Sequence, residues 1–297
     1  MKIKKEKMKS IITSAIMLVG ALVCLYPAIS NYFAEKNHAE ILETYTEAVE
    51  SLSEETIAEE FAKAQEYNEN LSGDPVHDPF IGGSGYTIPG NYEEVLNING
   101  DGVMGYIDIP SISAYLPIYH GTDSDTLLKG VGHIEQSSLP IGGVSTHSVL
   151  TGHTGVPTSE LFTKISKLEV GDVFYIHVLN KTLKYEIYET KVIEPEDISE
   201  LTIEEGRDLV TLVTCTPYGV NSHRLLVKGE RTADDEEITE TTGDITTNSY
   251  KYLILICVLV IIIIIAIIII IFVINDIKIN RKAKHLKRRR NNRNRRR

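Results

Sequence analysis

Cysteine is scarce in this 297-residue chain, and the positions of its three cysteines exclude a disulfide framework. Cys24 and Cys257 lie inside two strongly apolar stretches, where a thiol behaves as a small hydrophobic group. Only Cys215 lies in the long region between those stretches, so that region cannot form an internal disulfide. A lone thiol in an oxidising compartment is a liability unless it has a use, which draws attention to Cys215.

Charge is absent from the second apolar stretch, which runs from Leu253 to Ile274. About 20 apolar residues in a helix cross the hydrocarbon core of a bilayer, so this stretch predicts a membrane span. The first stretch, from Ile11 to about Tyr26, follows a basic leader and has small residues near Ala28. It fits either a signal peptide or a retained anchor, and both would send the following region across a membrane.

The charge distribution predicts the orientation. Residues 1–9 carry +4 and residues 275–297 carry +11, which leaves −26 for residues 10–274 out of a total of −11. Basic flanks favour the cytoplasmic side, so we predict cytoplasmic termini and an extracellular middle region. The basic tail could also be a nucleic-acid arm, but next to a span it is more simply an anchor for anionic lipid.

The amino-acid composition of the middle region changes twice along the chain. Residues 30–71 are rich in Glu and Ala, which predicts two helices with a break at 51–53 and one face formed by Ile57, Phe61, Ala62 and Gln65. Residues 73–102 are rich in Gly, Pro, Asn and Asp, which indicates a long loop. From Val103 onward, short β-branched runs separated by turns predict a mostly antiparallel barrel or sandwich.

The passage from Thr211 to Arg231 carries the most chemical information. One strand ends at Cys215, and after a short loop a second strand opens with His223 and Arg224. If the two strands pair as a hairpin, the thiol and the guanidinium meet at its mouth. A guanidinium cannot act as a base, but it can stabilise a thiolate or a developing oxyanion.

A cysteine nucleophile also needs a proton shuttle. His153 is the better candidate because it stands between glycines in TGHTG, directly after an apolar strand. Side chains alternate along a strand, so His223 and Arg224 should face opposite sides, with Arg224 toward the groove and His223 toward the packed side. For His120, His133 and His147, in turn-like contexts, we expect surface positions.

Three motifs together, TGHTG, TLVTC and the later HR, resemble the sortases, the cysteine transpeptidases on the surface of Gram-positive bacteria. The likeness covers about residues 102–231. It implies a closed eight-stranded β-barrel in which Cys215 attacks the Thr–Gly bond of an LPxTG-like signal. His153 would protonate the leaving amine, Arg224 would hold the oxyanion, and an amine would resolve the thioacyl intermediate. We predict neither a metal nor another cofactor.

Two features resemble the pilin-polymerising class C sortases in particular. One is the second apolar span. The other is Asp78-Pro79-Phe80 in the long loop, which in that class forms a lid whose aspartate pairs with the catalytic arginine and whose ring covers the cysteine. Asp-Pro is also common in ordinary turns. The resemblance implies pilin or surface-protein substrates and a pilin lysine as acceptor.

Two alternatives remain. The chain could be a housekeeping sortase that attaches surface proteins to a peptidoglycan precursor, or a non-catalytic binding barrel tethered at the membrane. The expected fold is mainly β, with N-terminal helices, a lid loop and a transmembrane helix near each end. The expected segments are a basic leader (1–9), a first span (10–29), helices (30–72), a lid loop (73–101), the barrel (102–232), an acidic stalk (233–250), a second span (251–274) and a basic tail (275–297).

Overall fold

The computed structural model describes residues 2–71 and 90–232, with scattered positions between 260 and 281. The predicted lid residues Asp78, Pro79 and Phe80 lie outside the described residues, as does most of the predicted second span. The chain divides into two units, and residues 30–242 form the unit that contains the barrel.

Two helices precede the barrel. Helix α1 runs from Lys2 to Glu50 and helix α2 from Glu54 to Asn70. The break falls where it was predicted because the hydroxyl of Ser53 caps α2, accepting a hydrogen bond from the amide of Thr56 at 3.1 Å. Within Ala15–Glu50, α1 contains a stretch that is apolar and long enough to cross a membrane, and none of that stretch is buried in the structure.

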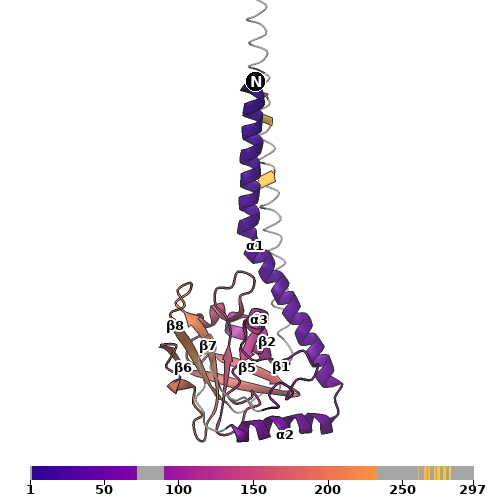
Figure 1. Ribbon diagram of the computed structural model, residues 1–297, viewed down its shortest axis with the longest axis vertical. Helices are drawn as coiled ribbons and strands as arrows, with labels where there is room; N and C mark the ends of the chain where they lie inside the picture. Colours follow the sequence, from indigo (N-terminus) through magenta and orange to yellow (C-terminus); the bar gives the residue numbers. More distant parts are fainter. Residues whose placement is uncertain are drawn as a thin grey trace, which may run out of the picture. The chain divides into compact units, whose positions relative to one another are not determined.

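Eight strands close into a barrel in the order β1-β2-β3-β4-β7-β8-β6-β5 (Figure 1). Most neighbours are antiparallel, but β2 with β3 and β4 with β7 are parallel. The prediction of a closed eight-stranded barrel is therefore confirmed. The strands are β1 (Val103–Ile109), β2 (Ala114–His120), β3 (Val131–His133), β4 (Thr146–Thr151), β5 (Val173–Val178), β6 (Lys181–Ile193), β7 (Asp208–Thr216) and β8 (His223–Arg231).

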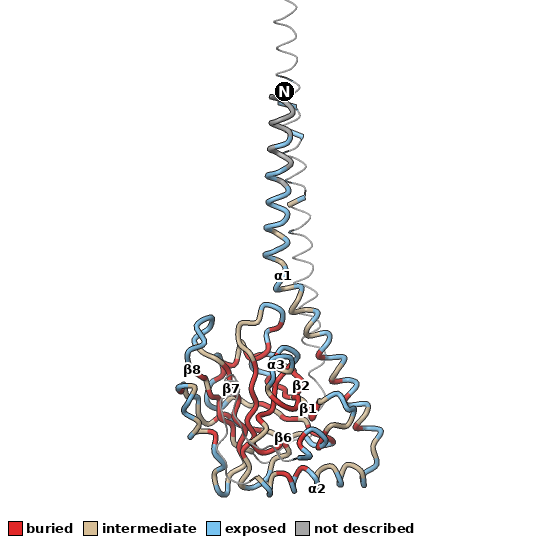
Figure 2. Tube along the Cα trace, viewed as in Figure 1, coloured by how far each residue is buried: buried red, intermediate tan, exposed pale blue. Residues whose placement is uncertain are grey.

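Short helices fill the connections between strands. They are η1 (Pro110–Ile112), α3 (Ser124–Lys129), η2 (Leu161–Lys167) and η3 (Ser199–Leu201). The buried residues concentrate along the strands, as Figure 2 shows, and the main core fills the barrel interior. A second, smaller apolar cluster lies on the outer face of the sheet and consists of Ile134, Val149, Ile193, Leu201, Val213 and Leu226.

Helix α2 packs on the barrel through a face that only partly matches the predicted one, because Ile57 and Phe61 pack against the core as predicted. Ala64 and Tyr67 are its buried residues, whereas Ala62 and Gln65 are exposed. Tyr67 sets this face because its ring packs 5.8 Å from the buried ring of Tyr92 and its hydroxyl donates to the carbonyl of Glu135. In Figure 1, α2 lies along the lower end of the barrel.

Helix α1 reaches the barrel through its C-terminal part. The hydroxyl of Tyr45 donates to the carbonyl of Met104 at 3.1 Å and accepts from the amide of Leu179 at 2.9 Å. Leu42 and Val49 are buried on the same stretch. The helix is thereby fixed to the start of β1 and the end of β5 by both apolar and polar contacts.

Candidate functional site

Cys215 and Arg224 are direct partners in the antiparallel ladder between β7 and β8. Directly opposed residues on neighbouring strands project to the same face with Cβ atoms about 5 Å apart. Cys215 is partly exposed, whereas Arg224 is only 7% exposed. The predicted hairpin therefore exists, and it brings the thiol and the guanidinium together at its open end.

The side of the barrel on which this pair stands follows from the alternation along the strands. Leu212 and Val227 belong to the main core inside the barrel. Their neighbours Val213 and Leu226 belong to the smaller outer cluster. Cys215 and Arg224 lie two residues from Val213 and Leu226 respectively, so they share the outer face with that cluster.

The backbone next to His153 is fastened alongside β7. Strand β4 runs parallel to β7, with Thr151 opposite Val213. Beyond this pair, the amide of Gly152 donates to the carbonyl of Val213 at 3.1 Å, and the hydroxyl of Thr214 donates to the carbonyl of Gly152 at 2.6 Å. These bonds place His153 at the same end of the sheet as Cys215.

The loop that carries His153 is also held from its other side. The amide of Phe162, in η2, donates to the carbonyl of His153 at 3.2 Å. A Cβ atom at Gly152 would lie 2.8 Å from the ring of Phe162, so only glycine fits this position. The second glycine of TGHTG has a different role, because Gly155 adopts a positive φ of 75° and its amide donates to the hydroxyl of Thr163 at 3.0 Å.

The electrostatics of the site combine one permanent cation with one neutral imidazole. The Nη1 atom of Arg224 donates to the carbonyls of Asn221 and His223, at 3.3 and 3.2 Å, which orients the guanidinium at the strand end. Burial lowers the pKa of His153, so its neutral form is favoured near pH 7. A thiol next to a fixed positive charge favours its thiolate form.

His223 lies at the rim of the barrel rather than on a packed side. Its side chain is 40% exposed, and its Nε2 atom lies 3.2 Å from the carboxylate of Glu194. Its Nδ1 atom contacts the hydroxyl of Ser222 at 2.8 Å. The first residue of a strand has few neighbours to cover it, which explains why alternation alone did not predict its exposure.

The surface positions expected for three other histidines are wrong. His120, His133 and His147 are 5%, 0% and 1% exposed, and both ring nitrogens of each have polar contacts. Burial lowers the pKa of His133 to about 3. Among the described residues, no group of three or more His, Cys, Asp or Glu side chains could hold a metal ion.

Comparison with known proteins agrees with this geometry. The sortase domain matches residues 107–232. Sortase D of Bacillus subtilis is 35% identical over 43% of this chain and 63% of its own length, so the chain matches slightly less than two thirds of that relative. Sortase C-1 of Actinomyces oris is 54% identical, with a TM-score of 0.58 over 61% of this chain and 99% of that structure.

A pilus-related sortase C of Group B Streptococcus is 41% identical, with a TM-score of 0.58 over 63% of this chain and 94% of that structure. The chain therefore belongs to the sortase family, a family of cysteine transpeptidases, and its structural neighbours are of class C.

Sequence reasoning missed the segment that joins β6 to β7, residues 194–207, which we call the crossover. It packs on the outer face near Cys215 and Arg224 through Leu201 and several charged groups. Its Glu-rich sequence gave no motif, and its partners on β4 and β8 are distant in sequence.

Proposed function

We propose that this protein is a membrane-anchored class C sortase that joins pilin subunits covalently. The observation that carries the proposal is the pairing of Cys215 with Arg224 on β7 and β8, with the loop of His153 fastened beside the same strand end. The pilin assignment is supported by the pilus-related neighbour of Group B Streptococcus and by the sequence likeness described above.

In the first step, neutral His153 accepts the proton of the Cys215 thiol, and the resulting thiolate attacks the carbonyl carbon of the threonine in an LPxTG-like signal. A tetrahedral oxyanion forms, and the Arg224 guanidinium stabilises it. The C–N bond to glycine then breaks, and the leaving amine takes a proton from the His153 imidazolium. The product of this step is a thioester between the threonine carbonyl and the Cys215 sulfur.

In the second step, the amine of a pilin lysine attacks the thioester carbonyl. Neutral His153 accepts a proton from that amine, the amide bond forms, and the Cys215 thiolate leaves. Arg224 stabilises the second oxyanion as it did the first. Because Arg224 keeps its proton throughout, His153 is the group that moves protons in both directions.

The membrane part of the proposal rests on the apolar helix from Ala15 onward. The second span and the cytoplasmic position of both termini stay predictions from the charge pattern. Reporter fusions after Arg297 should behave as cytosolic and insertions near Thr241 as external. A reporter after Arg297 that behaves as external contradicts this topology.

The catalytic proposal is tested with the full-length protein in detergent micelles and a fluorescent LPxTG peptide. We expect cleavage, capture of the thioacyl intermediate by hydroxylamine, and faster product formation with a lysine-bearing pilin peptide than with a peptidoglycan-like amine. A preference for the peptidoglycan-like amine would favour the housekeeping alternative. Binding without cleavage would favour the non-catalytic barrel.

A further inference from the structure

The crossover has to pass across the face on which Cys215 and Arg224 stand. Strands β6 and β7 both run antiparallel to β8, so they are parallel to each other. Strand β6 ends at Ile193, opposite Arg224, whereas β7 begins at Asp208 at the other end of the sheet. The crossover therefore returns over the full height of the outer face.

Leu201 is the residue through which the crossover packs on that face. Its side chain is 4% exposed and belongs to the outer cluster with Val213 and Leu226. These two residues are direct partners in the β7–β8 ladder, two positions before the pair of Cys215 and Arg224. Two residues along a strand span about 7 Å, so the crossover lies close to the catalytic pair.

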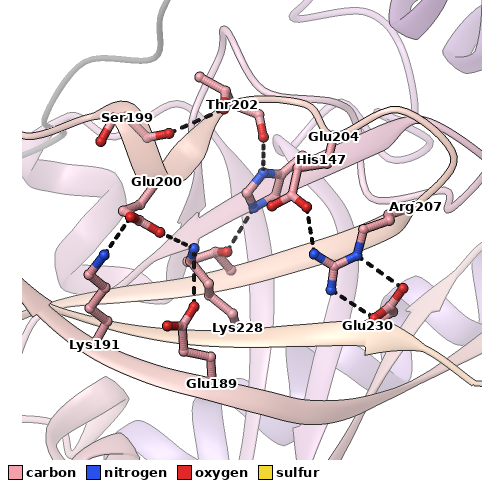
Figure 3. Close-up of polar contacts among 11 residues, drawn as sticks. His147, Glu189, Lys191, Ser199, Glu200, Thr202, Glu204, Arg207, Lys228 and Glu230 are labelled. Carbon is pink, nitrogen blue, oxygen red and sulfur yellow. Dashed lines mark hydrogen bonds and ion pairs between the residues drawn. The ribbon is translucent and has the colours of Figure 1, made fainter.

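Both neighbours of Leu201 are anchored to the barrel, as Figure 3 shows. On one side, the carboxylate of Glu200 bonds to the ammonium groups of Lys228 and Lys191, the latter at 2.5 Å. On the other side, the carbonyl of Thr202 lies 2.8 Å from Nδ1 of His147. The position of Leu201 is therefore fixed by polar contacts of the residues on both sides of it.

The tautomer of His147 follows from its partners. A carbonyl oxygen can only accept, so Nδ1 carries the proton that bonds to Thr202. The other nitrogen, Nε2, then accepts a hydrogen bond from the hydroxyl of Thr211 at 2.7 Å. Burial lowers the pKa of His147, which keeps the ring neutral and this arrangement intact at neutral pH.

The Glu200 anchor depends on a buried cation. The side chain of Lys228 is 5% exposed, and its other carboxylate partner is Glu189 at 3.4 Å. Burial is the largest single effect and lowers the pKa of Lys228, but the bond to Glu200 and the nearby Tyr188 and Glu189 together raise it. A buried ammonium that loses a partner is strongly unfavourable, so Lys228 holds Glu200, and with it the crossover, in one place.

Lys191, the exposed partner of Glu200, contributes less to holding Glu200 in place. The side chain of Lys191 is 42% exposed, and exposed ion pairs contribute little. The hydrogen bonds from Lys191 and Lys228 lower the pKa of Glu200 to about 2, so its charge persists at physiological pH. Lys228 is therefore the partner that fixes the anchor, and Lys191 adds a solvated contact.

We propose that Glu200 and Lys228 are positioning residues that hold the crossover as a fixed wall for the extended peptide substrate. The inference rests on the proposed function, because Cys215 lies on the outer face and a sorting signal would have to reach it there. Because the crossover is already ordered, the free energy of substrate binding does not have to offset the entropic cost of ordering this segment. Leu201 is buried, so it would hold the wall against the barrel and would not itself touch the signal.

The test compares variants of the full-length protein with a fluorescent LPxTG peptide. Glu200→Gln and Lys228→Met should raise KM at least fivefold while kcat changes less than twofold. Lys228→Arg keeps the charge and should restore KM to within about twofold of the wild type. In parallel, hydrogen exchange of the amides in η3 should become faster in Glu200→Gln and Lys228→Met.

The matched control is Glu230→Gln, which breaks an ion pair between Arg207 and β8 at the far end of the crossover. It should leave KM unchanged. An unchanged KM in Glu200→Gln overturns the proposal, and a lowered KM overturns it too, because the crossover would then obstruct the substrate. Failure of the wild type to cleave the peptide at all would instead overturn the proposed function.

Discussion

Cys215 and Arg224 face each other across one rung of the β7–β8 ladder, and Arg224 is nearly buried while Cys215 is accessible. The arginine is therefore held by the barrel, and the thiol is presented to solvent beside it. This asymmetry suits a nucleophile that must meet a large substrate and a cation that must not move during the reaction.

The first prediction concerns the three proposed catalytic residues. Cys215→Ala should abolish both cleavage and joining of the LPxTG peptide. His153→Ala and Arg224→Ala should each lower kcat by about 10²–10³ without changing the circular dichroism spectrum, because each removes one transition-state interaction. His223→Ala serves as the control, and its kcat should stay within about threefold of the wild type. Equal losses in His223→Ala and His153→Ala would contradict the assignment of His153.

The second prediction concerns the contact behind His153. In Gly152→Ala the new methyl group would meet the buried ring of Phe162 at 2.8 Å, so the loop or the ring must shift. Overpacking of this kind costs about 1–3 kcal/mol. We expect a modest fall in melting temperature and a drop in kcat of tenfold or more. Gly90→Ala, with open space around the added atom, should change neither quantity.

The third prediction concerns Asp108 on β1, a buried carboxyl whose pKa burial raises to about 6. Between about pH 4 and 6 the folded protein keeps a proton on this group that the unfolded chain has lost. The folded state is therefore penalised as pH rises through 6, by roughly 2–3 kcal/mol at pH 8 relative to pH 4.

Asp108→Asn removes that penalty, so its stability relative to the wild type should increase from pH 4 to pH 8. Melting temperatures measured across this range should diverge by about 4–10 °C. Asp125→Asn, at an exposed position in α3, should give no such divergence. A constant difference between Asp108→Asn and the wild type at all pH values would show that the carboxyl is not penalised.

The sequence predicted local features well. The break before α2 was predictable because Ser53 caps a helix whose first turn contains Glu54 and Glu55. The pairing of Cys215 with Arg224 was predictable because a short loop joins their strands. In both cases the determining residues are within ten positions of one another.

Features that depend on distant partners could not be predicted. His147 is buried because Thr202, 55 positions away, and Thr211 accept and donate at its two ring nitrogens. The buried face of α2 is set by Tyr92, which lies 25 positions after its partner Tyr67 in the chain. The anchors of the crossover belong to the same class, since Glu200 and Lys228 have no sequence relationship that marks them as partners.

The last prediction comes from the sequence alone and concerns Asp78 and Phe80, which lie outside the described residues. If an aspartate–arginine pair and an aromatic contact shield the thiol, their loss should expose it. An exposed ion pair contributes at most about 1 kcal/mol and a part-buried Phe about 1.5–3 kcal/mol, so the shield would open spontaneously for a fraction of the time. A sorting signal that binds the open form would shift the balance further.

The experiment uses full-length protein with Cys24→Ser and Cys257→Ser, which leaves Cys215 as the single thiol. Adding Asp78→Ala and Phe80→Ala should speed labelling by a bulky maleimide severalfold and raise hydrolysis of a sorting peptide. Asp74→Ala is the matched control, because Asp74 also precedes a proline but no aromatic residue follows it. Equal labelling rates in all of these proteins would mean that Asp78 and Phe80 do not shield Cys215, and the sequence argument for a class C lid would then fail.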